Sequence, residues 1–369
     1  MAPPRLNDGS TPTVGTNKQR IRLAFGVTLG ALTAGLFISL TAGIVIGPVA
    51  IPALQVWEIV LHRLFPTLTH TGTWTQGREQ IVWELRLPRV LLGACVGAGL
   101  SVVGTTLQAL VRNPLADPYV FGITSGASAG ATLVLALGIA TFGSSALALA
   151  AFIGAVTSLA LVLVLAGTHG SISPTRIILS GLAVAFSMSA LTSFMVFKAS
   201  TAGESGAAES VLFWLLGGLA GSRWEFVGLP AIAVLVAVVI ALTYARALNT
   251  LLIGDETAAT LGTDINRVRI GLFTLSALLT GVMVAVSGGI GFVGLMVPHA
   301  VRMVMGSDHR RVLPVAVLLG AIFLIWADVL ARTVVAPQEL PIGIITAVFG
   351  TPFFVLIMRW RSKDLRGTR

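Results

Sequence analysis

Long runs of apolar residues, separated by short polar segments, dominate this chain. A helix needs about 20 mostly apolar residues to cross roughly 30 Å of hydrocarbon, and it satisfies its own backbone hydrogen bonds inside lipid. The runs therefore predict about ten membrane-spanning helices, of which glycine and proline interrupt the third and the eighth. The expected spans are residues 22–46, 88–110, 118–138, 145–166, 176–198, 227–245, 268–288, 291–305, 312–332 and 342–359.

The composition agrees with this pattern. Hydrophobic residues make up 55% of the 369 residues, charged residues make up 11%, and the mean hydropathy is +0.91. Such a chain has too little polar surface to cover a soluble globule. We therefore expect an all-α polytopic membrane protein with a transmembrane domain over residues 20–360, a disordered tail over 1–19 and a basic tail over 361–369.

The basic residues predict an orientation. When the N-terminus is placed in the cytoplasm, most of the lysines and arginines fall in cytoplasmic segments, as the positive-inside rule requires. Both termini are then cytoplasmic. The net charge of +9 is explained by contact between these residues and anionic lipid headgroups, so no nucleic acid partner is expected.

Glycine is abundant within the apolar runs rather than between them. Gly93 with Gly97, and Gly126 with Gly130, form faces of small residues that let helix backbones approach closely in lipid. Close packing accounts for most of these glycines, and the rest are candidates for helix breaks beside a conducting path.

Several kinds of chemistry have no motif in the chain. The single cysteine, Cys95, excludes an intramolecular disulfide, and no two histidines are spaced three or four apart as on a metal-binding helix face. None of the three lysines completes a GxxxxGK[ST] phosphate loop, and no catalytic constellation is evident. We therefore expect no catalytic residue, no bound metal and no enzymatic activity in this polypeptide.

One polar interval between apolar runs is long, charged and predicted to be helical. Residues 246–269 carry Asp255, Glu256 and Asp264 between paired glycines. A protein driven by a soluble partner needs such a docking surface, whereas a solvated turn would have the same composition. The residues alone leave both interpretations open.

Charged residues also occur within or beside the spans. Asp328 and Arg332 are four apart on one helix face, where they can neutralise each other or leave the arginine to an external carboxylate. Arg86 and Arg89 flank a proline that can open the second span. These two arginines suit either a carboxylate partner or ordinary contact with the membrane interface.

Three stretches carry a family resemblance. Residues 85–118, which include LRLPR and NPLADP, residues 288–302, and the segments 328–332 and 339–354 resemble permease subunits of ABC importers for ferric siderophores, haem and cobalamin. These are the FecCD-type permeases of type II importers. The motifs are long, ordered and correctly spaced, and the likeness covers about residues 20–360.

The resemblance implies a fold and a set of partners. It implies a bundle of about ten helices like that of a cobalamin permease, which pairs with a second copy or a paralogue in the bacterial plasma (inner) membrane. Two cytoplasmic ATPase subunits would bind ATP and Mg, so this chain would hold no cofactor itself. An extracytoplasmic substrate-binding protein would deliver the cargo, and the lipid bilayer would surround the bundle.

The resemblance also assigns roles to residues of this sequence. It implies that the binding protein docks on Arg86, Arg89 and Arg332. It also implies that the ATPase is coupled through Gly254, Asp255, Glu256, Gly262 and Thr263. The cytoplasmic gate falls to Ser173, Pro174 and Thr175, where the family pattern has a small hydroxyl residue in place of the proline. The segment 213–224 is similar to a short outer helix, with Trp214 and Trp224 as interfacial anchors.

The implied function is ATP-driven import of an iron–siderophore complex, with haem or cobalamin as alternative cargoes. A proton-coupled secondary transporter using Asp328 is an alternative from another class, although an arginine one helical turn away opposes a proton-carrying role. A third alternative is a structural membrane scaffold.

Overall fold

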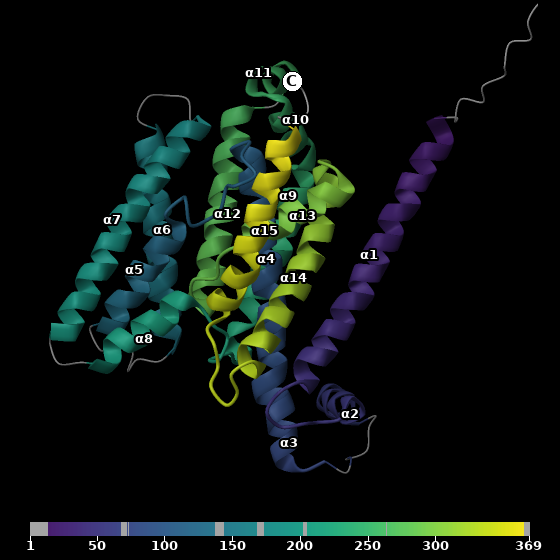
Figure 1. The fold of residues 1–369 in the computed structure, drawn as a ribbon, viewed down its shortest axis with the longest axis vertical. Helices are drawn as coiled ribbons and strands as arrows, with labels where there is room; N and C mark the ends of the chain where they lie inside the picture. The colour runs from purple at the N-terminus through teal and green to yellow at the C-terminus, as the bar shows by residue number, and fades with distance from the viewer. Residues whose placement is uncertain are drawn as a thin grey trace, which may run out of the picture.

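A computed structural model describes residues 14–67, 72, 74–136, 144–167, 173–201, 205–262 and 264–364, and these residues contain helices but no strand (Figure 1). The helices that correspond to the expected spans are α1 Val14–Val45, α4 Leu87–Leu110, α5 Ile123–Ala136, α6 Ser144–Gly167, α7 Pro174–Thr201, α9 Gly228–Thr243, α12 Ile265–Ser287, α13 Val293–Met305, α14 His309–Thr333 and α15 Ile342–Asp364. The remaining elements are α2 Ala53–Leu64, α3 Gln76–Gln80, the π-helix η1 Ile81–Arg86, α8 Ser205–Leu216, the 3-10 helix η3 Trp224–Phe226, α10 Ala245–Ile253 and α11 Asp255–Thr260.

Seven helices in the described part of the chain are long and apolar enough to cross a membrane, and α5, α13 and the apolar part of α15 are shorter apolar helices. The expected all-α polytopic architecture is confirmed. The α10–α11 pair lies at one end of the molecule, called the upper end here, and α2 and α3 lie at the lower end (Figure 1). The described chain begins and finishes toward the upper end, because α1 starts there and α15 finishes there (Figure 1).

Helix α4 forms the centre of the bundle. It packs against α14, α12, α13 and α9, and most of its residues are buried. A Cβ atom on Gly97 would overlap the carbonyl oxygen of Gly320 in α14, and one on Gly104 would overlap that of Gly294 in α13. Glycines therefore set the distance between these helices, as the small-residue pattern predicted. On one side α5, α6 and α7 form a packed group, and α1 lies on the other side against α14 (Figure 1).

Two helices continue past the expected boundaries of the transmembrane domain. Helix α1 begins at Val14, so the segment 14–19 is helical rather than part of a disordered tail. Helix α15 continues to Asp364, so part of the segment 361–369 is helical as well. In both cases the helix continues past the apolar run, because polar residues such as lysine, arginine and glutamine have good helix propensity. Residues 1–13 and 365–369 lie outside the described residues.

The second span also begins earlier than expected. Pro88 does not open the helix, because a continuous helical segment runs from Gln76 to Leu110. A proline inside a helix removes one backbone donor and clashes with the preceding turn. Here the preceding turn is π-helical, and the Leu87 N–H bonds to the carbonyl oxygen of Val82, five residues back. The wider turn accommodates the proline without ending the helix.

Three helix interruptions meet inside the bundle. Helix α8 ends before Gly217, with a φ of 71°, and α12 ends at Gly288, with a φ of 65°. Both values lie in the left-handed region that glycine adopts easily. The Gly218 N–H donates to Ser287 O at 2.8 Å, and the Ile342 N–H at the start of α15 donates to Gly217 O at 2.9 Å. The hydrogen bonds hold the interrupted backbones of α8, α12 and α15 together.

Candidate functional site

An arginine–carboxylate cluster lies where the lower ends of α4 and α14 meet. Arg89 Nη2 is 2.8 Å from Asp328 Oδ1, and Arg89 Nη1 is 2.9 Å from Glu339 Oε1. Arg332 Nε lies 3.3 Å from Asp328 Oδ2, so the pair suggested by the four-residue spacing is present. Asp328 is buried while Glu339 is exposed. The sequence did not indicate that Arg89 joins this pair.

Arg86 and Arg332 are both buried against the end of α1. Arg86 Nη1 donates to Ile44 O at 2.8 Å and to Val45 O at 3.1 Å, and Arg332 Nη2 donates to Gly43 O. The last carbonyl groups of a helix have no partner within the helix, and cationic donors stabilise them. Arg86 and Arg332 therefore cap α1. Their docking role stays a prediction, and of the three predicted docking arginines only Arg89 contacts an exposed acidic residue.

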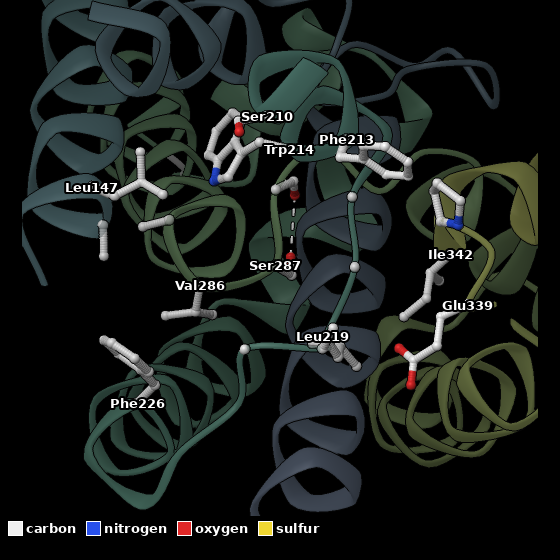
Figure 2. A pocket seen from close by; sticks show the side chains of 18 of the residues that line it. Leu147, Ser210, Phe213, Trp214, Leu219, Phe226, Val286, Ser287, Glu339 and Ile342 are labelled. Atoms are coloured by element: carbon white, nitrogen blue, oxygen red, sulfur yellow. Dashed lines mark hydrogen bonds between the residues drawn. The ribbon is translucent and has the colours of Figure 1, made fainter. Parts of the chain in front are cut away.

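A cavity of about 420 Å³ lies beside the three helix interruptions. Figure 2 shows Trp214, Leu219, Phe226 and Val286 around this cavity, with the carboxylate of Glu339 at one side. The walls come from α8, the end of α12, and the segments 217–221 and 339–342. The mostly apolar lining offers few directional contacts to a cargo.

The expected outer helix over residues 213–224 is wrong. Helix α8 ends at Leu216, and the chain then continues through Gly217 and Gly218 to the short η3. Two successive glycines disfavour helix continuation, and the positive φ of Gly217 turns the chain. Trp214 lines the cavity, while Trp224 Nε1 donates to Trp83 O at 2.8 Å. Both tryptophans are half-buried and have contacts within the chain, and their role as interfacial anchors stays a prediction.

A second cavity, of about 400 Å³, is lined by the segment between α4 and α5 together with Gly289, Phe292 and Gly343. Asp117 in this segment is 8% exposed, and its Oδ1 accepts the Tyr119 N–H at 3.0 Å. Burial raises the pKa of this carboxyl group to about 6, against the opposing effect of that hydrogen bond. The sequence analysis did not single out Asp117, since a lone aspartate between prolines reads as a turn residue.

The predicted coupling segment forms two short helices, α10 and α11, at the upper end. Gly254 connects them with a φ of 140°, and Gly262 follows α11 with a φ of 80°, so both positions favour glycine. Glu256, Ile253 and Leu261 are exposed around this helix pair, with exposed fractions of 68% for Ile253 and 63% for Leu261. Exposed apolar residues beside a charged one are typical of a partner surface. Thr263 lies outside the described residues.

Asp255 anchors this helix pair to the bundle. Its Oδ1 lies 2.7 Å from Arg112 Nη2, just beyond the end of α4, and 3.0 Å from Arg269 Nη2 in α12. Asp255 is also the first residue of α11, where a negative charge favours the helix dipole. The sequence predicted Asp255 as an exposed contact, whereas the structure gives it two arginine partners within the chain. Asp264 caps α12, because it accepts the Arg267 N–H at 3.1 Å.

The predicted gate residues begin α7, at the upper end (Figure 1). Ser173 Oγ accepts the Arg176 N–H at 3.3 Å, and Pro174 is the first residue of the helix. Proline suits that position, because its missing N–H would have no partner within the helix. Thr175 follows with an exposed side chain. The gating role of Ser173, Pro174 and Thr175 stays a prediction, and Ser171 and Ile172 lie outside the described residues.

Comparison with known proteins identifies relatives over almost the whole chain. Residues 7–360 match the profile of the FecCD transport family. The Fe(3+)-citrate import system permease protein YfmD of Bacillus subtilis is 41% identical over 304 residues, which cover 82% of this chain and 88% of the relative. The cobalamin import system permease protein BtuC of Halobacterium salinarum is 42% identical, with 77% and 74% of the two chains covered.

A third relative and a solved structure agree with this match. The hemin transport system permease protein HmuU of Yersinia pestis is 38% identical, with 80% of this chain and 90% of the relative covered. A solved structure described as an inward-facing conformation of a putative metal-chelate type ABC transporter superposes with a TM-score of 0.77 and 32% identity. The superposition covers 90% of this chain and 98% of that one.

Proposed function

The chain belongs to the FecCD transport family of ABC importer permeases, and on this premise we propose that it forms part of the membrane path for an iron–siderophore complex. A second copy of the chain or a paralogue supplies the other half of the path. An extracytoplasmic binding protein delivers the complex, and two cytoplasmic ATPase subunits, which bind ATP and Mg, drive its passage. This permease carries out no covalent chemistry.

The observation that carries the proposal is the α10–α11 pair. It presents Glu256, Ile253 and Leu261 at the surface, and Asp255 joins it to the end of α4 and to α12. Movement of a partner bound to this surface is therefore transmitted through Asp255 to α4 and α12. Gly254 and Gly262 shape the surface, and Thr263 completes the proposed coupling segment. This arrangement suits an ATPase subunit that drives transport from outside the membrane domain.

The lower end of the bundle suits the binding protein. Arg89 lies at the edge of the 420 Å³ cavity and contacts the exposed Glu339. A carboxylate from a docked partner can replace Glu339 at Arg89, since arginine binds carboxylates through a planar fork. Arg86 and Arg332 join this docking surface only when the end of α1 moves away from them. The cavity beside Arg89 then receives the cargo.

The proposed orientation follows from these assignments. The upper end, with α10, α11, the start of α1, the end of α15 and the gate residues Ser173, Pro174 and Thr175, faces the cytoplasm of a bacterium. The lower end faces outward across the plasma membrane. The distribution of basic residues supports this orientation through the positive-inside rule.

Iron–siderophore complexes are the proposed cargo, and haem or cobalamin is the alternative within the same family. The relatives include permeases named for Fe(3+)-citrate, hemin and cobalamin import, so the family membership supports all three classes. The apolar cavity suits a bulky chelate that passes without tight coordination.

A proton-coupled transporter that uses Asp328 is less well supported. Such a carrier needs a carboxylate that gains and loses a proton during transport. Asp328 contacts Arg89 and Arg332 at 2.8 Å and 3.3 Å, so its carboxylate already lies between two arginines inside the bundle. Asp328 therefore suits a fixed ion pair between α4 and α14.

The decisive experiment measures uptake by the reconstituted complex. The permease, its ATPase and its binding protein are placed in proteoliposomes with ATP inside, and radiolabelled ferric siderophore, haem or cobalamin is supplied outside. We expect accumulation of the ferric siderophore with ATP and none with ADP. Accumulation of haem or cobalamin instead would change only the cargo. Accumulation that does not depend on ATP but is abolished by a proton uncoupler would refute the ATP-driven importer and favour proton-coupled transport through Asp328.

A further inference from the structure

A polar cavity at the upper end has no role in the transport path described above. Its volume is about 360 Å³, and it lies among the ends of α4, α10 and α13 and the start of α14. The polar residues that line it are Gln108, Arg112, His299, Arg302, Ser307 and His309, and none of its lining residues is an aspartate or glutamate. The cavity is therefore a cationic hollow, at the end of the bundle that we assign to the cytoplasm.

Arg302 carries a charge that no carboxylate neutralises among the described residues. Its guanidinium donates to the side-chain oxygen of Gln108, a neutral partner. Gln108 is itself fixed, because its Nε2 donates to Gly294 O at 2.9 Å. A partly buried arginine with only an amide partner retains most of its attraction for an anion. Arg112, the other arginine of the cavity, is already paired with Asp255.

His309, which also lines the cavity, has a ring nitrogen without a hydrogen-bond partner. The side chain is fully buried, and its Nδ1 lies 2.7 Å from Asn249 Oδ1. Asn249 Nδ2 donates to Asp308 Oδ1 at 2.8 Å, which fixes the orientation of the Asn249 amide. The Asn249 oxygen therefore faces His309, and because this oxygen can only accept, His309 Nδ1 is the donor. His309 Nε2 is buried without a hydrogen-bond partner. A buried polar atom of this kind indicates a missing ligand or water.

The rim of the cavity is apolar. Met303 in α13 is 52% exposed and Leu252 in α10 is 36% exposed, and both line the cavity. Val304, next to Met303, is 78% exposed. An apolar rim around a cationic hollow matches a molecule with an anionic head and apolar chains.

We propose that this cavity binds the phosphate group of an anionic phospholipid, held by Arg302 with support from Arg112. Arg302 supplies the planar fork that matches phosphate oxygens. His309 Nε2 accepts a hydrogen bond from a headgroup hydroxyl, such as the glycerol hydroxyls of phosphatidylglycerol. The acyl chains lie along the apolar surface of Met303 and Val304. Because Arg112 also holds Asp255, a bound lipid would brace the end of α4 beside the α10–α11 pair.

The test uses the full-length chain purified in a non-ionic detergent. Native mass spectrometry measures the binding of phosphatidylglycerol and of phosphatidylcholine, and thermal unfolding measures stabilisation by each lipid and by inorganic phosphate. The test variant is Arg302→Gln. The matched control is Arg310→Gln, which removes the same charge from an exposed side chain that does not line the cavity.

We expect phosphatidylglycerol to bind and stabilise the wild type and phosphatidylcholine to do neither. Affinity for phosphatidylglycerol should fall about tenfold in Arg302→Gln, as the loss of one charge-assisted hydrogen bond predicts, and stay unchanged in Arg310→Gln. Stabilisation by inorganic phosphate alone, lost in Arg302→Gln, would support the same phosphate site with a free anion as its source.

Other results would overturn the proposal. The proposal is refuted if the wild type binds phosphatidylglycerol and phosphatidylcholine equally and is not stabilised by inorganic phosphate. This result needs only the wild type, so it holds even if Arg302→Gln fails to fold. If Arg302→Gln and Arg310→Gln lose phosphatidylglycerol binding equally, the binding depends on the net charge of the protein and not on this cavity. If Arg302→Gln weakens only the association with the ATPase, a carboxylate of that partner occupies the cavity, and the lipid site is refuted.

Discussion

Arg89 Nη2 in α4 lies 2.8 Å from Asp328 Oδ1 in α14, although 239 residues separate them in the chain. Asp328 thereby contacts two arginines, since Arg332 lies one helical turn further along α14. The pairing of Arg89 with Asp328 joins the two helices at their lower ends. It also places Arg89 between a buried carboxylate and the exposed Glu339.

Replacement of Asp328 should therefore destabilise the protein strongly. Asp328→Asn leaves Arg89 and Arg332 without a buried counter-charge, and breaking a buried ion pair from one side costs about 3–5 kcal/mol. Thermal unfolding in detergent measures the effect. Glu339→Gln is the control, because Glu339 is exposed and its removal should cost about 1 kcal/mol or less. Equal unfolding temperatures for wild type and Asp328→Asn would contradict the structural role of the pair.

Arg86 should behave as a structural residue. Arg86→Gln removes the donors that satisfy the carbonyl oxygens of Ile44 and Val45 at the end of α1. Each buried acceptor left without a partner costs about 1–3 kcal/mol, so the unfolding temperature should fall clearly. Arg78→Gln is the control, since Arg78 is exposed and donates to the side chain of Gln55. If Arg86→Gln weakens binding-protein docking at an unchanged unfolding temperature, docking and not capping is its main role.

The apolar pattern was enough to predict most of the fold. Hydropathy specifies where a chain must be helical inside lipid, so each of the ten expected spans corresponds to a helix. The hydropathy pattern did not predict helix boundaries that depend on backbone geometry. A π-helical turn before Pro88 extends the second span to Gln76, and the break at Gly217 and Gly218 ends α8. Neither feature changes the hydropathy pattern, although the two successive glycines are themselves a signal for a helix end.

The side-chain partners were less predictable than the helices. Spacing on one helix revealed Asp328 with Arg332, because residues four apart share a face. Contacts between helices carry no such local signal, so the pairing of Arg89 with Asp328 and of Asp255 with Arg112 had to come from the structure. Arg86 was read as an interfacial or docking arginine, because the sequence does not show which carbonyl groups lie unpaired beside it.

The anchoring of α11 should be needed for transport more than for folding. Asp255→Asn removes the charge that holds Arg112 and Arg269, so movement of α11 no longer pulls equally on α4 and α12. Typical coupling energies between sites correspond to changes of about 5-fold or more, so ATP-dependent uptake should fall about 5-fold or more. Glu58→Gln is the control for loss of an exposed acidic charge, because Glu58 lies in α2 at the opposite end of the bundle (Figure 1). Normal uptake in Asp255→Asn would show that the anchor does not transmit movement.

Close helix packing should depend on Gly104 and not on every helical glycine. A Cβ atom in Gly104→Ala would overlap the backbone of Gly294, which forces α4 and α13 apart, and overpacking typically costs about 1–3 kcal/mol. Gly271→Ala in α12 is the control, because a Cβ there has no neighbour within 4 Å. Alanine favours a helix over glycine, so Gly271→Ala should be neutral or stabilising. Unfolding temperatures that change alike in both variants would refute this distinction.

Asp308 should make stability depend on pH at the start of α14. Burial acts to raise its pKa, but hydrogen bonds from Asn249 Nδ2 and the Arg310 N–H, with the charges of Arg311 and Arg310, outweigh burial and lower the pKa below its ordinary 3.8. A carboxyl group whose pKa is lower in the folded state stabilises the fold above its ordinary pKa and loses that contribution as pH falls through the folded value. The stabilisation should therefore be complete at pH 7 and decline below about pH 4.

Two substitutions separate the charge of Asp308 from its capping role. Asp308→Ala removes the cap of α14 and should cost about 1 kcal/mol at pH 7. Asp308→Asn keeps a good capping oxygen but has no charge to lose, so its deficit relative to the wild type should shrink as pH falls below about 4. Unfolding temperatures measured from pH 7 to pH 3.5 provide the comparison. A constant difference between wild type and Asp308→Asn across this range would show that the carboxylate charge adds nothing to the cap.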